Sequence, residues 1–261
     1  MESGDATAVA RLLAWFRAEG EDLPWRRTRD RYAVLVAEIQ LQATPVRRVI
    51  PYYERWMDRW PTAASLARAR LGDVLALWQG LGYPRRARNL HAAAQRVAER
   101  GWPPPERLTE LPGVGPYTAS AIRCFADGEP VLPIDTNVAR VLARRFPAGW
   151  PGAPAGAGWD AGQALMDLGR LWCTARAPRC DAGCPVRAGC PAADGNRAQE
   201  ATRPRRRQGR YEGSLRQRRG LLLRALAEGV PVDAARDPEA AASLVADGLA
   251  RRRGRRLLPA E

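Results

Sequence analysis

Four cysteines within 18 residues are the strongest constraint on how this chain can fold. Intervals of six, three and five residues separate Cys173, Cys180, Cys184 and Cys190. So dense a group, in a chain with an odd total of five cysteines, indicates a metal or iron–sulfur site rather than a disulfide scaffold. Four thiolates can hold a [4Fe–4S] cluster. Structural zinc is the alternative, but it usually uses close Cys-x2-Cys pairs, and the sequence has none.

Apolar residues recur at intervals of three and four along most of the chain, and the alternation typical of strands is scarce. Within residues 7–19, for example, Val9, Leu12 and Phe16 share one helical face. The pattern predicts an all-α fold that leads into the cysteine segment. The predicted helices cover residues 7–19, 31–42, 46–60, 71–77, 86–97, 106–110, a stretch that begins near residue 117, 136–146 and 159–172.

The balance of charge favours a polyanionic partner. The sequence has 42 basic and 28 acidic residues, a net charge of +14, and nucleic acid is the usual partner of so basic a protein. All 42 basic residues are arginine, which excludes catalysis through a lysine Schiff base. No stretch approaches the roughly 18 apolar residues of a membrane span, and the first residues lack the basic segment of a signal peptide, so we expect a cytoplasmic protein.

A glycine-rich turn, Leu111-Pro112-Gly113-Val114-Gly115, joins two of the predicted helices. Two glycines one residue apart let the backbone turn sharply and expose consecutive N–H groups at the start of a helix. Such donors suit a phosphate group. Gly-Val-Gly alone is common in ordinary turns, whereas the longer Leu-Pro-Gly-Val-Gly-Pro-Tyr-Thr motif between two helices is a much stronger indication of a phosphate site.

Two carboxylates are candidates for catalysis. Asp135 lies at or just before the start of a predicted helix, where it is either an ordinary N-cap or a negative charge placed to face a developing cation. Glu38 lies at the border of an apolar helical face that includes Leu35. An apolar wall raises the pKa of a carboxyl group, which suits a general acid, whereas a solvated helical glutamate is the ordinary alternative.

The C-terminal part of the chain predicts a separate small module. Residues 195–213 resemble a flexible basic linker, and residues 214–228 and 238–250 each predict a helix. The arginine-rich segment Arg251–Leu258 predicts a hairpin with Gly254 at its turn. Two helices and a basic hairpin over residues 214–261 indicate a winged-helix-like module. The alternative is a helical pair with a solvated basic tail.

Taken together and in this order, the motifs resemble the helix-hairpin-helix DNA glycosylase superfamily and, within it, the MutY-type adenine DNA glycosylases. The resemblance covers residues 8–192. Its motifs are Leu23-Pro24-Trp25-Arg26, Ala37-Glu38-Ile39-Gln40-Leu41-Gln42-Ala43-Thr44, Gly80-Leu81-Gly82-Tyr83, Leu111–Thr118, Asp135-Thr136-Asn137-Val138, Met166-Asp167-Leu168-Gly169 and the four cysteines.

MutY-type enzymes remove adenine mispaired with 8-oxoguanine or guanine, and they flip it out of the duplex into a pocket. The resemblance implies that Glu38 protonates the adenine ring and that Asp135 stabilises the oxocarbenium-like sugar before water adds. It also implies a [4Fe–4S] cluster on the four cysteines and a monomer whose partner is double-stranded DNA with an adenine mispair. The other matched positions are Asn137 and Tyr117 beside the reacting sugar and base, Trp25, Arg26, Leu41, Gln163 and Met166 in the adenine pocket, and Gln42, Tyr83, Gly113, Val114 and Gly115 on the DNA.

Several of the matched residues have ordinary alternatives, and the chain departs from the family in three places. Trp25, Leu41 and Met166 are alternatively plain core, and Arg26 plain surface. The family usually shows Leu-Gln-Gln-Thr, but here Ala43 replaces the second glutamine and cannot fill the gap left by a flipped base. The second cysteine interval is three residues instead of two, and a bulge in the loop accommodates the extra residue. The residues after the linker are too few for the Nudix-like domain that inspects 8-oxoguanine.

The resemblance implies two helical domains that flank a cleft. Residues 28–132 form a six-helix bundle with the hairpin, and residues 1–27 with 133–194 form the iron–sulfur domain. Relatives that also cleave the DNA strand use a lysine just after the hairpin. A chain without lysine is therefore implied to be a monofunctional glycosylase.

Two other functions stay open at this point. A glycosylase of the same fold that acts on thymine or uracil opposite guanine differs only in its pocket, where Leu23–Arg26 with Gln163 favour adenine. A non-catalytic iron–sulfur DNA-binding sensor is the second alternative, but it needs neither Glu38 nor Asp135.

Overall fold

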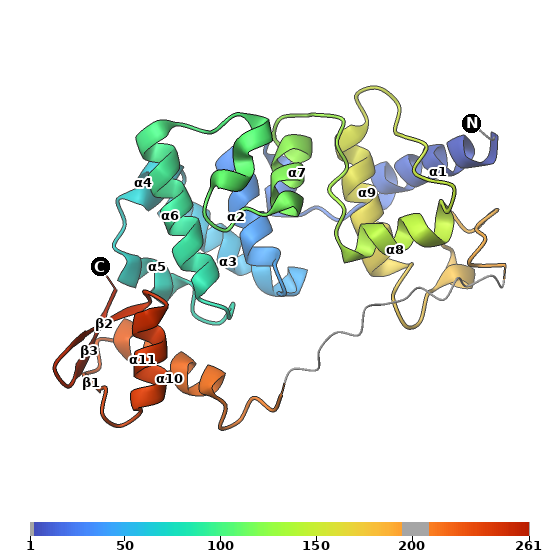
Figure 1. Ribbon diagram of the computed structural model, residues 1–261. Helices are drawn as coiled ribbons and strands as arrows, with labels where there is room; N and C mark the ends of the chain where they lie inside the picture. The colour runs from blue at the N-terminus through green and yellow to red at the C-terminus, as the bar shows by residue number, and fades with distance from the viewer. Residues whose placement is uncertain (1–2, 195–208, 261) are drawn as a thin grey trace. The chain divides into compact units, whose positions relative to one another are not determined.

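The computed structural model describes residues 3–194 and 209–260, and these residues form eleven α-helices, three short 3-10 helices and three strands (Figure 1). The predicted all-α class is confirmed. The chain divides into two compact units, residues 1–34 with 116–205, and residues 35–115 with 206–261. Most of the predicted linker at 195–213 lies outside the described residues. No helix in the described ranges combines the length and the apolarity that a membrane crossing needs.

The first unit is built around helix α9 (Gly158–Leu171). Helices α1 (Ser3–Glu19), α7 (Pro116–Phe125) and α8 (Thr136–Arg145) pack against it. Two short 3-10 helices, Pro24–Arg27 and Cys180–Ala182, complete the described elements of this unit. Its core is aliphatic where these helices meet, and it includes Leu12, Leu13, Val138, Val141, Leu165 and Leu168.

The second unit contains the helices that lead to the glycine-rich turn. Helix α2 (Arg31–Leu41) enters it from the first unit, and α3 (Val46–Arg59), α4 (Ala63–Ala67), α5 (Leu71–Leu77), α6 (Arg85–Arg100) and the 3-10 helix Pro105–Glu110 follow. Helices α4 and α5 pack against α6. Edge-to-face contacts join Trp56 to Trp60 and Trp78, with ring centroids 5.0 and 5.5 Å apart. Such contacts add to the stabilisation that aromatic burial provides.

Residues 209–260, which we call the C-terminal module, have the order α10 (Leu215–Ala227), β1 (Val232–Asp233), α11 (Pro238–Ala246), β2 (Ala250–Arg253) and β3 (Arg256–Pro259) (Figure 1). Its antiparallel sheet has the order β1-β3-β2. The predicted hairpin is confirmed, with Gly254 at φ +59° in its turn.

The predicted helix at 238–250 is wrong at its C-terminal end. Helix α11 stops at Ala246, because Gly248 takes a left-handed φ of +62° and Ala250 already pairs in β2. Apolar residues continue past the end of the helix because Leu249 and Ala250 are buried as well. Hydrophobic periodicity alone therefore extended the helix into the strand.

Gln40 generates a prediction about stability. Its side chain is fully buried on α2, and neither amide atom has a hydrogen-bond partner among the described residues. Since burying an unpaired amide is costly, replacing Gln40 by methionine, which is apolar and similar in size, is expected to raise the free energy of unfolding by about 1–3 kcal/mol. Urea denaturation measures the change. Gln95→Met, at an exposed site on α6, is the control and is expected to stay within about 0.5 kcal/mol. A lower stability for Gln40→Met contradicts the interpretation.

Candidate functional site

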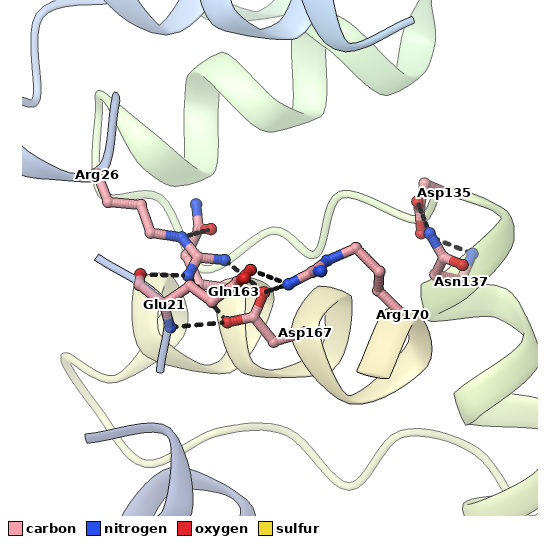
Figure 2. Close-up of polar contacts among 7 residues, drawn as sticks. All are labelled: Glu21, Arg26, Asp135, Asn137, Gln163, Asp167 and Arg170. Carbon is pink, nitrogen blue, oxygen red and sulfur yellow. Dashed lines mark hydrogen bonds and ion pairs between the residues drawn. The ribbon is translucent and has the colours of Figure 1, made fainter. Parts of the chain in front are cut away.

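Asp135 caps helix α8, and all its described contacts come from N–H donors. Its Oδ1 accepts hydrogen bonds from the backbone N–H groups of Asn137 at 2.8 Å and Val138 at 2.7 Å. Its Oδ2 accepts one from the Asn137 side-chain amide at 2.9 Å (Figure 2). The donors and the helix N-terminus stabilise negative charge here and fix the orientation of the carboxylate. The N-cap interpretation is thus confirmed, and an oriented negative charge is also what the catalytic interpretation requires.

A buried arginine continues this network toward the cysteines. The Asn137 side-chain oxygen accepts a hydrogen bond from Arg140 Nη2 at 2.7 Å. The same nitrogen donates to the Gly169 carbonyl at 2.7 Å, and Arg140 Nε donates to the Cys173 carbonyl at 2.6 Å. One guanidinium therefore connects the residue that orients Asp135 with the first residue of the cysteine segment. The sequence pattern did not single out Arg140.

The four clustered cysteines line one cavity of about 150 Å³, and none of them forms a disulfide. Apolar side chains such as Val141, Leu168 and Val186 line the same cavity. Within the described residues, no group of three or more histidine, cysteine, aspartate or glutamate side chains is arranged to hold a single metal ion. The thiols surround a space with largely apolar walls.

Burial and nearby arginines act in opposite directions on these thiols. Desolvation raises the pKa of Cys184 to about 11 and also raises the pKa of Cys173. Arg144 Nη1 lies 3.6 Å from Cys173 Sγ and favours the thiolate there. A bound cation would favour the thiolate at all four positions, because it would add to the positive charge of Arg144, Arg145 and Arg176, which also line the cavity.

Arg26 and Asp167 form a buried ion pair in the first unit (Figure 2). Their side chains are 7% and 2% exposed, and two hydrogen bonds of 2.8 Å join them. Arg26 Nε also donates to Gln163 Oε1 at 2.7 Å. The interpretation of Arg26 as plain surface is therefore wrong. Because a guanidinium only donates, this contact identifies the oxygen of the Gln163 amide and leaves its NH2 group as a donor.

Glu38 lies on a helix that is buried on every side. Residues 32–40 of α2 are all buried, and Glu38 is only 6% exposed. The interpretation of Glu38 as a solvated helical residue is therefore wrong. A carboxyl group that is buried on a helix whose neighbouring residues are also buried is one that general-acid chemistry can use.

Arg86 ties the end of α2 to the turn before Tyr83. It donates to the carbonyls of α2 and its C-terminal turn, with distances of 2.8 Å to Ile39, 3.1 Å to Gln40 and 2.5 Å to Gln42. It also donates to the Leu81 and Gly82 carbonyls at 2.9 and 3.0 Å. Burial lowers the pKa of Arg86 to about 10, so it stays charged at neutral pH.

Two residues next to the segments that Arg86 joins have left-handed backbone conformations. Ala43 has a φ of +52° and Tyr83 a φ of +49°, which is uncommon for residues other than glycine. Tyr83 is 46% exposed. The glycine-rich turn has a related constraint, because a Cβ on Gly113 would lie 2.9 Å from Asn89 Cβ. A glycine is therefore needed at Gly113 for both space and conformation.

The predicted site residues are divided between the two units. Trp25 and Gln163 are buried in the first unit, and Met166 is half-buried there. The first unit holds Trp25, Arg26, Tyr117, Asp135, Asn137, Gln163, Met166 and the four clustered cysteines, and the second holds Glu38, Leu41, Gln42, Tyr83, Gly113, Val114 and Gly115. The sequence motif Met166-Asp167-Leu168-Gly169 predicts no role for Asp167, although its position on the buried face of α9 indicates one.

Comparison with known proteins identifies the class first. Residues 36–153 match the HhH-GPD superfamily of base excision DNA repair proteins. The fold agrees with that of a thermostable thymine-DNA glycosylase, with 26% identity, a TM-score of 0.67 and coverage of 73% of this chain and 97% of the other. An endonuclease III in a DNA complex shares the fold at 21% identity and a TM-score of 0.62, with coverage of 74% and 98%.

Curated relatives then identify the family. The adenine DNA glycosylase of Mycobacterium tuberculosis is 40% identical, and the match covers 96% of this chain and 93% of the relative. The adenine DNA glycosylase of Homo sapiens is 42% identical, over 69% of this chain and 38% of the relative. The chain belongs to the adenine DNA glycosylase family of the HhH-GPD superfamily.

The buried ion pair generates a prediction about stability. Asp167→Asn leaves the Arg26 guanidinium buried without its counter-charge, and such a loss typically costs about 3–5 kcal/mol of unfolding free energy. Asp160→Asn on the same helix is the matched control, since its partner Arg17 is 61% exposed and a surface pair contributes about 1 kcal/mol or less. Chemical denaturation of both variants measures the difference. Equal losses would show that burial of the Arg26 pair is not what matters.

Proposed function

We propose that this protein is a monofunctional DNA glycosylase that excises adenine opposite 8-oxoguanine or guanine. The observation that carries the proposal is the 40% identity, over 96% of the chain, to a relative named adenine DNA glycosylase. The buried Glu38 and the oriented Asp135 supply the two carboxylates that the reaction needs. Its partner is duplex DNA in the cytoplasm, and the enzyme acts as a monomer.

The reaction breaks the bond between adenine and its sugar. Glu38, held on an apolar helix, donates a proton to the adenine ring and makes the base a leaving group. Adenine leaves with the bonding electron pair, and an oxocarbenium-like sugar remains. Asp135, oriented by Asn137, faces this cation and stabilises it. Water then adds to the sugar and gives up a proton, which leaves an abasic site and free adenine. Tyr117 completes the support of the sugar and base.

The network around Arg26 prepares the base pocket. Because Arg26 is bound to Asp167, it acts as a positioning residue rather than a direct contact. Its bond to Gln163 Oε1 leaves the amide NH2 as the donor proposed for the flipped base. Trp25, Leu41 and Met166 supply the apolar walls against which adenine stacks.

On the DNA side, the exposed Tyr83 enters the base stack beside the oxidised guanine. Gly113, Val114 and Gly115 form the turn that binds the DNA backbone. The Val114 N–H already donates to the Leu111 carbonyl at 3.1 Å, so the N–H groups of Gly113 and Gly115 are the proposed phosphate donors. Gln42 takes the space of the flipped adenine in place of Ala43, and Arg86 holds the Gln42 carbonyl and the turn before Tyr83 in one arrangement.

The cysteine cavity supports a resident [4Fe–4S] cluster. A cluster is larger than a single ion, so its four thiolates surround a space instead of converging on a point, and Cys173, Cys180, Cys184 and Cys190 line such a space. When bound to the four cysteines, the cluster would supply iron–thiolate bonds that hold the segment folded. Arg140 connects the Cys173 carbonyl to Asn137, which in turn contacts Asp135.

A single-turnover assay tests the proposed activity. The unaltered protein is expected to release adenine opposite 8-oxoguanine and to give strand breaks only after alkali. Glu38→Gln should lose base release by a factor of about 100 or more, because no proton reaches the leaving base, and should keep its DNA affinity. Glu54→Gln, at an exposed position, is the control and should behave as the unaltered protein does.

A parallel duplex with thymine opposite guanine tests the second candidate. The similarity to a thymine-DNA glycosylase structure at 26% identity favours including it. Release of thymine without adenine would move the protein to that activity. Binding to both duplexes without release from either would favour a non-catalytic DNA-binding role.

The cluster has its own test. Cys184→Ala is expected to lose the visible absorption of a [4Fe–4S] cluster and to unfold at a lower temperature, since one iron–thiolate bond is gone. Cys124→Ala is the matched control, because the Cys124 thiol is buried elsewhere and lies 3.6 Å from the Gly158 carbonyl. If both variants keep the same absorption and iron content, the four cysteines do not hold the cluster.

A further inference from the structure

The β2–β3 hairpin concentrates positive charge on the surface of the C-terminal module. Arg251, Arg252, Arg253, Arg255 and Arg256 are all exposed, while Leu257 of β3 is buried. Arg253 and Arg256 stand directly opposite each other in the ladder. Like charges in that relation repel and weaken the hairpin. Within the described residues no carboxylate pairs with Arg252, Arg253 or Arg256, so the hairpin carries charge that its own module does not neutralise.

Outside the hairpin, two arginines of the module are paired with carboxylates. On α10, Arg218 pairs with Asp237 and Glu239, and Arg219 pairs with Asp247. These carboxylates belong to α11 or flank it, and α11 itself has no basic residue. The second helix of a helix-turn-helix unit usually reads bases in the major groove. In this module the second helix is α11, which has only acidic, apolar and small side chains. Carboxylates in or beside it pair with arginines of α10. The hairpin is left as the surface for a polyanion.

The module is anchored beside the two elements proposed to contact DNA in the same unit. The Asp247 carboxylate lies 3.5 Å from Arg85 Nε, and the Asp247 carbonyl accepts a hydrogen bond from Arg88 Nη1. Arg85 comes two residues after Tyr83, and Asn89, one residue after Arg88, packs against Gly113 of the glycine-rich turn. The start of α6 therefore meets the Tyr83 turn, the glycine-rich turn and the module. A further bond of 3.1 Å, from Gly72 N–H to the Ala260 carbonyl, fixes the end of the chain to α5.

We propose that the β2–β3 hairpin binds the phosphate backbone of the same duplex, within about one helical turn of the base pair contacted by Tyr83. The distance follows from chain length, because the seven residue-to-residue steps from Asp247 to Gly254 span at most about 25 Å and a helical turn of DNA is about 34–36 Å. The sheet order β1-β3-β2 is that of a winged-helix module, here with two helices instead of three, and the β2–β3 hairpin stands where the wing would be. Phosphate contacts carry no sequence information, which suits an enzyme that must act wherever a mispair occurs.

The match to the Mycobacterium tuberculosis relative covers 96% of this chain, so most of the C-terminal module lies within it, whereas the match to the human relative covers 69%. The module is thus shared with the first relative. The inference rests on the proposed function only for the location of the mispair.

The salt dependence of DNA affinity tests the hairpin. Fluorescence anisotropy measures the Kd of the full chain for a duplex of about three helical turns at several salt concentrations. The variant Arg252→Ala/Arg253→Ala/Arg256→Ala should reduce the slope of log Kd against log salt by about 2–3, since each phosphate contact contributes about 0.9. The ratio of the Kd of this variant to the Kd of the unaltered protein should then increase about 40-fold when the salt concentration falls from 200 to 50 mM.

A matched variant removes the same charge elsewhere in the module. Arg216→Ala/Arg224→Ala/Arg236→Ala replaces three exposed arginines outside the hairpin and should keep the slope of the unaltered protein. Shortening the duplex on one side of the mispair to about half a helical turn should lower the slope of the unaltered protein to that of the hairpin variant. Shortening the other side should not. Equal slopes for the two triple variants, or equal effects of both shortenings, overturn the proposal.

The two proposals fail in different ways. With saturating protein, the hairpin variant should release adenine at the unaltered single-turnover rate, because the hairpin touches no reacting group. If the unaltered protein releases no adenine, the proposed function fails, and the slope measurement on the same duplex still decides the hairpin. If adenine is released but the slopes agree, only the hairpin inference fails.

Discussion

In each compact unit, the guanidinium of one arginine, buried for Arg140 and half-buried for Arg86, bonds to several backbone oxygens and joins segments that carry candidate site residues. Arg140 does this in the first unit for the Gly169 and Cys173 carbonyls and the Asn137 amide, and Arg86 does it in the second for α2 and the turn before Tyr83. Arginine can do so because its planar group offers five donors in fixed directions and stays charged when it is desolvated. Lysine has neither property to the same degree, and this chain contains none. The segments that carry the two candidate carboxylates are thus held by cations whose own hydrogen bonds go mainly to the main chain.

Much of the fold could be predicted because most helices have a clear apolar face. Helix α5 has its predicted bounds, and α2 and α3 end within one residue of the prediction. Helix α4 was missed because five residues are too few for a repeat, although Thr62 and Ser65 form a capping box that marks its start. Strand β1 was missed because two residues cannot alternate. The boundary between α11 and β2 depends on the pairing of β2 with β3, and a local sequence pattern does not contain that information.

The site was harder to predict than the fold. Periodicity placed Glu38 at the edge of an apolar face, but α2 is buried all round, and only packing shows that. Arg26 matched a pocket position, yet its ion pair with Asp167 bridges 141 residues of sequence and could not be inferred from spacing. The roles of Arg86 and Arg140 likewise depend on carbonyl groups, which every residue has and no sequence distinguishes. Sequence motifs could therefore predict the candidate catalytic side chains, but they could not predict the residues that orient them.

The helix cap that Asp135 forms affects how relatives of this protein should be interpreted. Its oxygens cap α8 and would do so whether or not a sugar cation ever formed beside them. A descendant that had lost the reaction would still gain helix stability by retaining this aspartate, so natural selection could preserve it for structural reasons alone. Glu38 lies in the interior of its helix and caps nothing. When a related genome encodes a protein with this fold, the residue aligned with Glu38 is therefore the better indicator of a working enzyme.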